Sequence, residues 1–417
     1  APAPVVAPTP APAPTPPPSL PAPAAAPTAA EIEALRQQLA AKAAPPPTAT
    51  AKALTETVAK APTVALIEPK NGAEVDADNI EVVVQVTDAG GDVDEVRLYH
   101  NGKLVQDKGD RAASVTVRGG GKRVVQNFRI ELAAGRNVIR AIAFSKARVE
   151  SEPAEVTVTA KIQSVKPNVE VLAVGINEYK NPGLNLNYGV SDAKGVSEFF
   201  QRQKRLFGDV KVRELLNAQA TQGGILQSIA ALRTTKPDDL VVIYLAGHGM
   251  TIEDGTWYFV PHEVVYPERD EQLVKHGISG AMLQQEIAKL GARKVLMLID
   301  ACKSGGAVVA FRGFEERKAL RQLARASGVH VVAAAGQDQL AGEIVRLNHG
   351  VFTYAVLEAL KGAADGAPKD GVVSVRETLS YVESRLPELS QEYRSKAQYP
   401  VVDSRGMDFP VATALAN

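Results

Sequence analysis

The sequence predicts an α/β domain with a mostly parallel central sheet, preceded by an all-β sandwich and a disordered Pro/Ala-rich N-terminus. Three observations predict this order: a Pro/Ala run over residues 1–27, short alternating strands from residue 63, and alternating strands and helices from about residue 168. A chain of 417 residues, 45% of them hydrophobic, is long enough for two or three domains with their own cores.

Charge and cysteine content exclude several classes of protein. Lys plus Arg and Asp plus Glu both number 47, and this balance argues against a general nucleic-acid binder and against charge-driven membrane binding. The single cysteine excludes an intramolecular disulfide, and no Cys/His cluster has the spacing of zinc ligands. No apolar run approaches the roughly 20 residues of a membrane-spanning helix. We therefore expect no nucleic-acid partner, no metal ligands and no transmembrane segment.

Residues 1–62 predict a linker that contains one short helix. Proline removes backbone N–H donors, so the run over 1–27 favours an extended, semi-rigid polyproline chain. A capping box at 28–31 and apolar residues at helical spacing then predict a helix near 29–42. Such a spacer at a start without Met suits an exported or membrane-tethered protein after processing, and a fragment of a longer cytosolic chain fits equally well.

Residues 63–162 predict a β-sandwich of the immunoglobulin-like type. Short strands with alternating apolar residues are expected at 80–86, 124–132, 137–144 and 155–160. Asn101-Gly102 lies between apolar pairs, which is a strong signal for a two-residue hairpin turn. The segment shows no catalytic chemistry, and we expect His100, at this turn, to be solvated.

Residues 168–403 predict the α/β domain, and 404–417 a C-terminal tail. Strands are expected at 169–177, 209–216, 239–247, 293–301 and 329–335, with a hairpin at 257–261. Helices are expected near 190–200, 225–233, 281–291, 352–362 and 374–386. This alternation is typical of a mostly parallel sheet with helices on both faces.

Two of these strands end in reactive side chains. His248 follows the strand at 239–247, and Cys302 follows the strand at 293–301. Sites in such sheets gather at the carboxyl ends of the strands, so parallel neighbours would bring the two side chains to one edge. A histidine is suited to activate a thiol as a nucleophile. The alternative, an inert buried cysteine, stays open at this point, although Cys302 lies just past the apolar run.

These residues resemble the caspase-like cysteine peptidases of family C14. The caspase pattern is Q-A-C-[RQG]-G with a histidine upstream. Here 300–305 is D-A-C-K-S-G, which is closer to metacaspases and their bacterial relatives, the orthocaspases. Further matches are V-G-I-N-x-Y at 174–179, L-N-Y-x-x-x-D-A at 186–193 and H-G-x-F-T at 349–353. The resemblance covers about 168–403, and bacterial chains with a β-sandwich ahead of the peptidase are familiar.

The resemblance implies a role for each matching residue. Cys302 would be the nucleophile, and His248 the general base and later the acid. The N–H groups of Gly249 and Cys302 would form the oxyanion hole. Asp192 and Asp300 would line an acidic P1 pocket, which would bind Arg or Lys and repel acidic residues. A charge that stabilises the start of a helix is the alternative for Asp192.

Other positions carry weaker matches. Glu343 resembles an acidic pocket residue of paracaspases across a small gap. Ala246 stands where many metacaspases have a serine, and Gly189 where they have a cysteine. The remaining histidines are expected to be structural: His262, His276, His330 and His349.

The resemblance also raises questions of regulation. The segment 303–328 is a basic linker of a kind that relatives often cut, so self-processing is a hypothesis. No required cofactor is expected. Calcium activates some metacaspases, but no EF-hand-like loop is present, and Glu253-Asp254 is taken as a polar turn.

These residues are compatible with three alternative functions. The first is an endopeptidase acting on protein or peptide substrates after Arg or Lys, with an unknown ligand for the sandwich. The second is a catalytically silent caspase-like scaffold. The third, a redox-sensing thiol, would need a resolving cysteine, which the chain does not have.

Overall fold

A computed structural model describes residues 61–90, 93–105, 123–301, 309–334, 348–394 and 397–414. Residues 59–417 form one compact unit. The Pro/Ala-rich region and its expected helix lie outside the described residues, as do Cys302 and Glu343.

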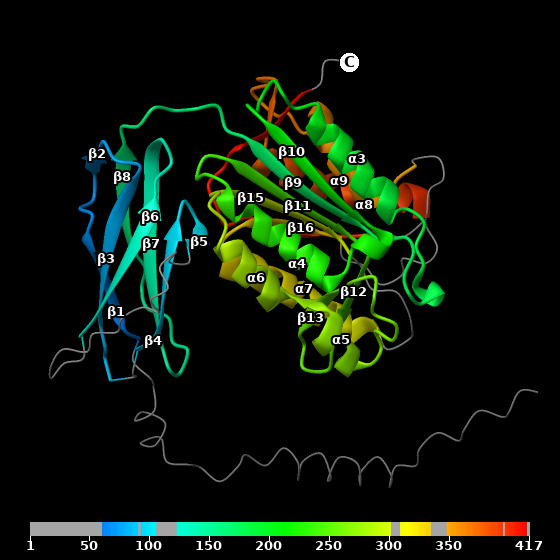
Figure 1. The fold of residues 1–417 in the computed structure, drawn as a ribbon, viewed down its shortest axis with the longest axis horizontal. Coiled ribbons are helices and arrows are strands. Elements are labelled where there is room, and N and C mark those ends of the chain that lie inside the picture. The colour runs from blue at the N-terminus through cyan, green and yellow to red at the C-terminus, as the bar shows by residue number, and fades with distance from the viewer. Residues whose placement is uncertain are drawn as a thin grey trace, which may run out of the picture. The chain divides into compact units, whose positions relative to one another are not determined.

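The first part of the described chain is a sandwich of two β-sheets (Figure 1). One sheet has the order β1 (Thr63–Glu68), β3 (Asn79–Thr87), β6 (Arg123–Glu131). The other has the order β2 (Ala73–Val75), β8 (Ala154–Ala160), β7 (Gly135–Ser145), β4 (Val93–His100), β5 (Lys103–Val105). Alternate residues of β3 are fully buried, among them Val82 and Val84, because successive side chains of a strand point to opposite faces. The predicted immunoglobulin-like sandwich is confirmed.

The Asn-Gly hairpin forms as predicted, but His100 beside it is not solvated. Asn101 and Gly102 both have positive φ, 53° and 89°, as the twist-matched two-residue turn requires. His100 is fully buried, its Nε2 lies 2.8 Å from Asn137 Oδ1, and Arg293 Nε donates to its Nδ1 at 2.8 Å. Burial lowers the pKa of His100 to about 3, so the ring stays neutral and Nδ1 can accept a hydrogen bond.

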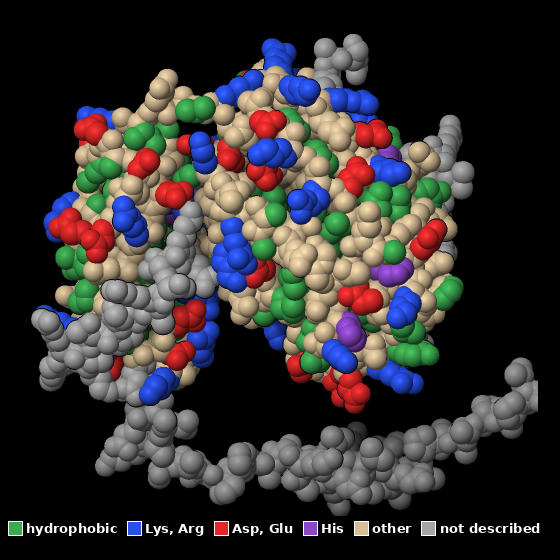
Figure 2. All heavy atoms as spheres, viewed as in Figure 1, with side chains coloured by type: hydrophobic (Ala, Val, Ile, Leu, Met, Phe, Trp, Pro, Cys, Tyr) green, Lys and Arg blue, Asp and Glu red, His purple; other side chains and the backbone are tan. Residues whose placement is uncertain are grey.

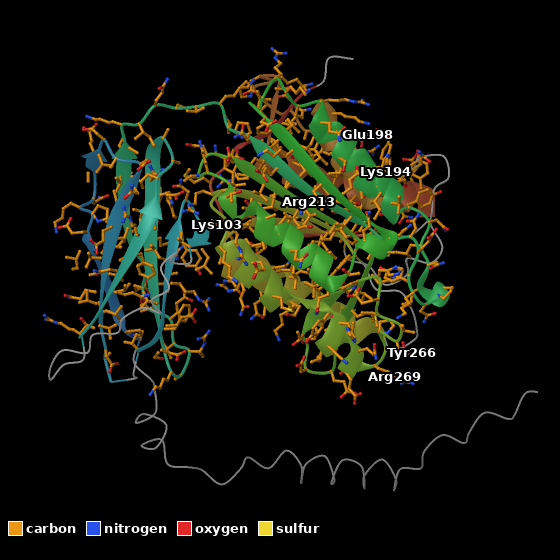
Figure 3. The ribbon with its side chains drawn as sticks, viewed as in Figure 1. Lys103, Lys194, Glu198, Arg213, Tyr266 and Arg269 are labelled. Carbon is orange, nitrogen blue, oxygen red and sulfur yellow. The ribbon has the colours of Figure 1, made fainter. Side chains whose placement is uncertain are left out.

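Lys103, which follows the turn, is also buried, and its charged end contacts a helix end in the second part of the chain. Its side chain is labelled in Figure 3, is fully buried, and donates from Nζ to Leu290 O at 2.9 Å. Leu290 lies just after helix α6 (Gly280–Ala288), where the helix dipole and unpaired carbonyls favour a cation. Gly102 packs on the backbone of Gly406 so closely that a Cβ atom on Gly102 would lie 2.6 Å from Gly406 Cα. The hairpin of the sandwich is therefore buried against the second part of the chain.

The second part contains a six-stranded sheet. Its order is β10 (Val210–Leu216), β9 (Val169–Gly175), β11 (Leu240–Ala246), β15 (Lys294–Asp300), β16 (His330–Ala333), β18 (Val401–Asp403). The first five strands are parallel and β18 is antiparallel to β16. Every residue of β11 is buried, since apolar layers cover both faces. The mostly parallel sheet is confirmed.

Helices cover both faces of this sheet (Figure 1). On one face lie α3 (Gly189–Gln201), α8 (Val351–Glu358) and α9 (Val375–Arg394). On the other lie α4 (Gln222–Ala231), α6 and α7 (Val309–Ser327). A hairpin of β12 (His248–Thr251) and β13 (Trp257–Val260) continues from β11, and α5 (Asp270–His276) and β14 (Ile278–Ser279) follow it. Short turns complete the domain: η1 (Pro182–Leu184), η2 (Asn217–Gln219), η3 (Leu232–Thr234) and the π-turn η6 (Ala359–Ala363).

Two expectations from the sequence are wrong, one about the basic linker and one about the C-terminal tail. Most of the expected basic linker is the helix α7, because Leu320, Leu323 and Ala324 recur at helical spacing and are buried against the sheet. The residues after Asp403 are not a detached tail. Within 404–417, β19 (Pro410–Thr413) pairs with β17 (Val372–Ser374) and contributes buried side chains to the core.

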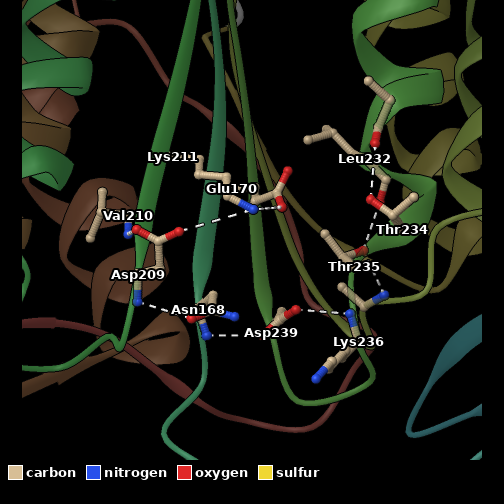
Figure 4. Close-up of polar contacts among 12 residues, drawn as sticks. Asn168, Glu170, Asp209, Val210, Lys211, Leu232, Thr234, Thr235, Lys236 and Asp239 are labelled. Atoms are coloured by element: carbon tan, nitrogen blue, oxygen red, sulfur yellow. Dashed lines mark hydrogen bonds and ion pairs between the residues drawn. The ribbon is translucent and has the colours of Figure 1, made fainter.

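Polar contacts hold the amino ends of the central strands together (Figure 4). Asn168 N donates to Asp239 Oδ1 at 2.9 Å, and Asn168 Oδ1 accepts from Asp209 N at 2.9 Å. Asp239 Oδ2 accepts from Lys236 N at 2.8 Å. These contacts tie β9 to both of its neighbours, so the carboxyl ends of the strands are also in fixed register.

The surface agrees with the balanced charge of the sequence. Figure 2 shows Lys and Arg interspersed with Asp and Glu over the face that it draws. Among the described residues, no helix has the length and apolar character needed to cross a membrane.

Candidate active site

The strands that carry the predicted dyad are parallel neighbours. β11 pairs with β15 in the register Ala246↔Asp300, and Gly247 N donates to Asp300 O at 3.1 Å. His248 and Ala301 therefore leave the sheet side by side. Cys302 follows Ala301 directly in the sequence and lies outside the described residues.

Gly249 allows the two strand ends to approach each other. A Cβ atom on Gly249 would overlap Ala301 O and would lie 2.8 Å from Trp257 Nε1. Only glycine fits there, and it brings the backbone of residue 249 next to the segment that leads into Cys302. The oxyanion hole formed by Gly249 and Cys302 stays a prediction.

His248 is buried, and one of its two ring nitrogens forms a hydrogen bond with the backbone. It is 3% exposed, and its Nε2 lies 2.7 Å from Leu184 O in η1. A carbonyl oxygen only accepts hydrogen bonds, so Nε2 carries the proton and Nδ1 is the basic nitrogen. Burial lowers the pKa of His248, opposed by the hydrogen bond to Leu184. The ring is thus a neutral base at neutral pH.

Tyr179 fixes the backbone of His248. His248 N donates to the Tyr179 hydroxyl at 2.9 Å, and the two ring centroids are 5.0 Å apart. A Cβ atom on Gly247 would lie 2.7 Å from this hydroxyl, so residue 247 must be glycine. Sequence reasoning matched Tyr179 to a family motif without giving it a role, and it did not identify Leu184.

Strand and helix periodicity bring Asp300 and Asp192 to the same face of the sheet. Leu296 and Leu298 of β15 pack on the face covered by α3 and α8, and Asp300 continues this alternation. Asp192 lies in the first turn of α3, whose outer side carries exposed Lys194 and Glu198 (Figure 3).

The two carboxylates converge on the backbone of Gly350. A Cβ atom on Gly350 would lie 3.0 Å from Asp192 Oδ2 and 3.3 Å from Asp300 Oδ2. Both oxygens thus lie close to one point in space, beside the strand ends that lead to His248 and Cys302. The structure brings together the two residues that the sequence assigned to the P1 pocket.

Asp192 is more enclosed than an open acidic slot would be. It is 3% exposed, and its Oδ1 accepts from His349 Nδ1 at 2.9 Å and from Gly350 N at 3.0 Å. Burial raises the pKa of Asp192, opposed by the contacts with His349 and Gly350. Both oxygens of this carboxylate accept hydrogen bonds from the 349–350 segment and not from the start of α3, which counts against the helix-dipole alternative.

Asp300 accepts a hydrogen bond from a residue of α8. Its Oδ2 accepts from Thr353 Oγ1 at 3.1 Å, and the Tyr244 hydroxyl lies 2.6 Å from the same Oγ1. Since the threonine hydroxyl has one proton, Tyr244 donates to it while it donates to Asp300. The motif at 349–353 therefore contacts both carboxylates, a role that sequence reasoning did not assign although it quoted the motif.

Of the two positions at which this chain differs from many metacaspases, Gly189 has a steric explanation. Ala246 is buried at the end of β11 directly beside Asp300. A Cβ atom on Gly189 would lie 2.8 Å from Ile176 O, because α3 starts close against the end of β9. A cysteine at position 189 would not fit this backbone.

The other residues considered for a functional role have structural contacts or lie in turns. His262 Nδ1 lies 2.7 Å from Glu178 O, and His330 contacts Ser404 and Met407 O. Asp254 Oδ1 accepts from Thr256 N at 2.7 Å, as in an ordinary turn. Across the described ranges, no group of three or more His, Cys, Asp or Glu residues is placed to hold a metal ion.

The fold and the strand-end geometry define a caspase-like α/β domain, and comparison with known proteins agrees. The sequence model of the Caspase domain family, Peptidase_C14, matches residues 170–411, and that of the Bacterial Ig domain family matches residues 62–137. Because the first match covers more than half of the chain, the chain belongs to the caspase-domain family, whose function is of the cysteine-peptidase type.

Two solved structures illustrate how remote the structural matches are. The fibronectin(III)-like modules of Clostridium thermocellum CbhA match at 19% identity and a TM-score of 0.19, covering 24% of this chain and 47% of that one. Caspase-1 from Spodoptera frugiperda matches at 12% identity and a TM-score of 0.36, covering 58% of this chain and 87% of that one. No curated protein sequence matches the chain.

Proposed function

We propose that this protein is a cysteine endopeptidase that hydrolyses peptide bonds after Arg or Lys. The convergence of Asp192 and Asp300 on Gly350, beside the strand ends that lead to His248 and Cys302, carries the proposal. No metal ligand or cofactor takes part in the chemistry, which needs only a base, a thiol and hydrogen-bond donors.

The dyad acts in two stages. Nδ1 of His248 takes the proton from Cys302 Sγ, and the thiolate attacks the scissile carbonyl carbon. The N–H groups of Gly249 and Cys302 stabilise the oxyanion, and His248 returns the proton to the leaving amine. Water activated by the same Nδ1 then hydrolyses the thioester. Leu184 O and the Tyr179 hydroxyl keep the imidazole in the required tautomer and position.

The two carboxylates supply the P1 preference. An ionised carboxylate has about four lone-pair sites, so Asp192 and Asp300 can each accept more than one hydrogen bond. A guanidinium or ammonium group can donate several charge-assisted hydrogen bonds to them. A P1 aspartate would meet like charge in a poorly solvated site.

A panel of fluorogenic peptides tests this function. The peptides differ only in P1, which is Arg, Lys, Gln or Asp, and are incubated with wild type and Cys302→Ala, with and without calcium. We expect Arg and Lys to exceed Asp by more than about 100-fold in kcat/KM, since like-charge contacts cost several kcal/mol. Faster cleavage after Asp would refute the acidic P1 site. Absence of any Cys302-dependent cleavage, with or without calcium, would identify a catalytically silent scaffold.

Self-processing is part of the proposal, and we expect it to spare the peptide bonds within α7. Peptidases bind substrates in an extended form, whereas the bonds after Arg317, Lys318, Arg321 and Arg325 lie within a helix. We therefore expect Cys302-dependent cuts to fall outside α7. Intact-mass analysis of wild type and Cys302→Ala checks this. Fragments ending at one of those four residues would contradict the protection by α7, and uncut chains in both samples would remove self-processing.

A further inference from the structure

We infer that Trp257 is a positioning residue for the oxyanion hole, because its indole N–H is placed to orient the peptide group that joins Ala301 to Cys302. This inference rests on the proposed function and deepens it, since it adds a supporting side chain to the predicted oxyanion hole of Gly249 and Cys302.

Strand pairing brings Trp257 beside Gly249. β12 and β13 pair antiparallel, with Thr251 opposite Trp257. Gly249 lies two residues before Thr251 and so on the same face of the hairpin, where an aromatic side chain can reach its diagonal neighbour. A Cβ atom on Gly249 would lie 2.8 Å from Trp257 Nε1 and would overlap Ala301 O. Glycine at position 249 therefore lets the indole N–H and this carbonyl oxygen border the same small space.

The indole N–H of Trp257 is a buried donor. Trp257 is 2% exposed, and its Nε1 is buried and forms no hydrogen bond with any of the residues that the structure describes. An indole can only donate, and a buried donor without an acceptor destabilises the fold. Buried polar groups in native proteins rarely lack a partner, so this one needs an explanation. The carbonyl oxygen of Ala301, itself a buried residue, is the acceptor that the geometry places beside it.

This carbonyl belongs to the peptide group that supplies a predicted oxyanion donor. A peptide group is planar and trans, so its C=O and its N–H point in opposite directions. The C=O of Ala301 and the N–H of Cys302 share one such group. A hydrogen bond from Trp257 Nε1 to Ala301 O therefore fixes the direction of the Cys302 N–H before charge develops on the substrate. Donors oriented in advance in this way stabilise an oxyanion most strongly.

The indole ring has space to complete this hydrogen bond. Trp257 also lines a cavity of about 270 Å³ between the turn at Gly255, the start of α6 and the helix α7. A side chain beside a cavity can shift without displacing closely packed atoms. Catalytic hydrogen bonds are often long or poorly aligned in the absence of substrate and tighten in the complex, so we expect the bond to Ala301 O to form when a peptide binds.

Replacing the indole N–H without changing the shape of the ring tests the inference. Because Trp257 is the only tryptophan, expression in a tryptophan auxotroph supplied with benzothienylalanine changes this residue alone and puts sulfur in place of the N–H. Trp257→Phe is a second variant that also removes the donor. Tyr258→Phe is the matched control, since it removes a polar group from the next residue of β13, whose side chain points to the opposite face.

Two measurements on each full-length protein separate positioning from folding. Hydrolysis of the P1 Arg peptide passes through an oxyanion, whereas alkylation by iodoacetamide, in which the Cys302 thiolate displaces iodide, does not. Cys302 is the only cysteine, so intact mass reports its alkylation alone. We expect both changes at Trp257 to lower kcat by about 10- to 100-fold, with KM and the alkylation rate changed by less than about threefold. Tyr258→Phe should match wild type in every measurement.

The other outcomes separate the inference from the proposed function. Wild-type kcat in the benzothienylalanine protein would overturn the inference, and so would a rise in KM at unchanged kcat, which indicates uniform substrate binding. Equal losses of kcat and of alkylation rate would also overturn it, because they would show that Trp257 supports the fold or the dyad. Absence of hydrolysis by the wild type, with Cys302 still alkylated, would instead refute the peptidase function.

Discussion

Replacing either member of the dyad is expected to abolish peptidase activity while leaving the fold intact. Cys302→Ala removes the nucleophile, and we expect kcat/KM to fall by at least about 10⁴-fold. His248→Ala removes the base and the acid, which costs about 10²- to 10⁴-fold. The P1 Arg peptide measures both variants. His276→Ala is the matched control, since His276 is the last residue of α5 and does not follow one of the central strands.

The pH profile of the wild type also tests the role of His248 as the base. The base must be neutral, and burial lowers the pKa of His248. Activity should therefore persist below the ordinary titration range of histidine and be lost as pH falls through the lowered value. The P1 Gln peptide is the substrate to use, because it is insensitive to the charge of Asp192. Retention of a tenth or more of wild-type activity by His248→Ala would contradict its role as the base.

Neutralising either carboxylate is expected to remove the preference for basic residues. Asp192→Asn and Asp300→Asn keep side-chain size and still accept hydrogen bonds from His349, Gly350 and Thr353. We expect kcat/KM for the Arg peptide to fall by about 30- to 1,000-fold, the effect of losing a buried charge contact of about 2–4 kcal/mol. The Gln peptide should change by less than about threefold.

A matched control and a clear contrary result accompany this prediction. Glu271→Gln removes an exposed carboxylate on α5 and should leave both substrates unaffected. Equal losses on the Arg and Gln peptides would show that Asp192 or Asp300 supports the fold or the position of the dyad, and not the choice of P1. For Asp192 this result would restore the alternative of a charge at a helix start.

Local signals predicted those parts of the fold that depend on local physics. The continuous apolar runs of β9, β11 and β15 indicated strands buried on both faces, and the structure confirms them. Asn101-Gly102 predicted its hairpin because few residues tolerate two consecutive positive φ angles. The helix α7 was missed because the segment was interpreted by its basic residues and not by its buried Leu320 and Leu323.

The contacts that tune the candidate site were not available from such signals. Leu184 supplies a backbone carbonyl, which every residue has, so no side chain could mark it in the sequence. His349 meets Asp192 across 157 positions of the chain. His100 is buried only because the sandwich hairpin packs against the second domain. Each of these contacts depends on segments that packing brings together.

The sequence by itself determined the order of domains, the parallel sheet and the strand-end position of His248. These follow from periodicity, from turn chemistry and from the rule that parallel strands end at one edge. The two carboxylates, Asp192 and Asp300, were assigned from the resemblance to the caspase-like family. Only the tertiary structure decided which nitrogen of His248 is basic and that Asp192 is paired with His349. Protonation and pairing depend on burial and on neighbours distant in the chain, and residue order does not specify these.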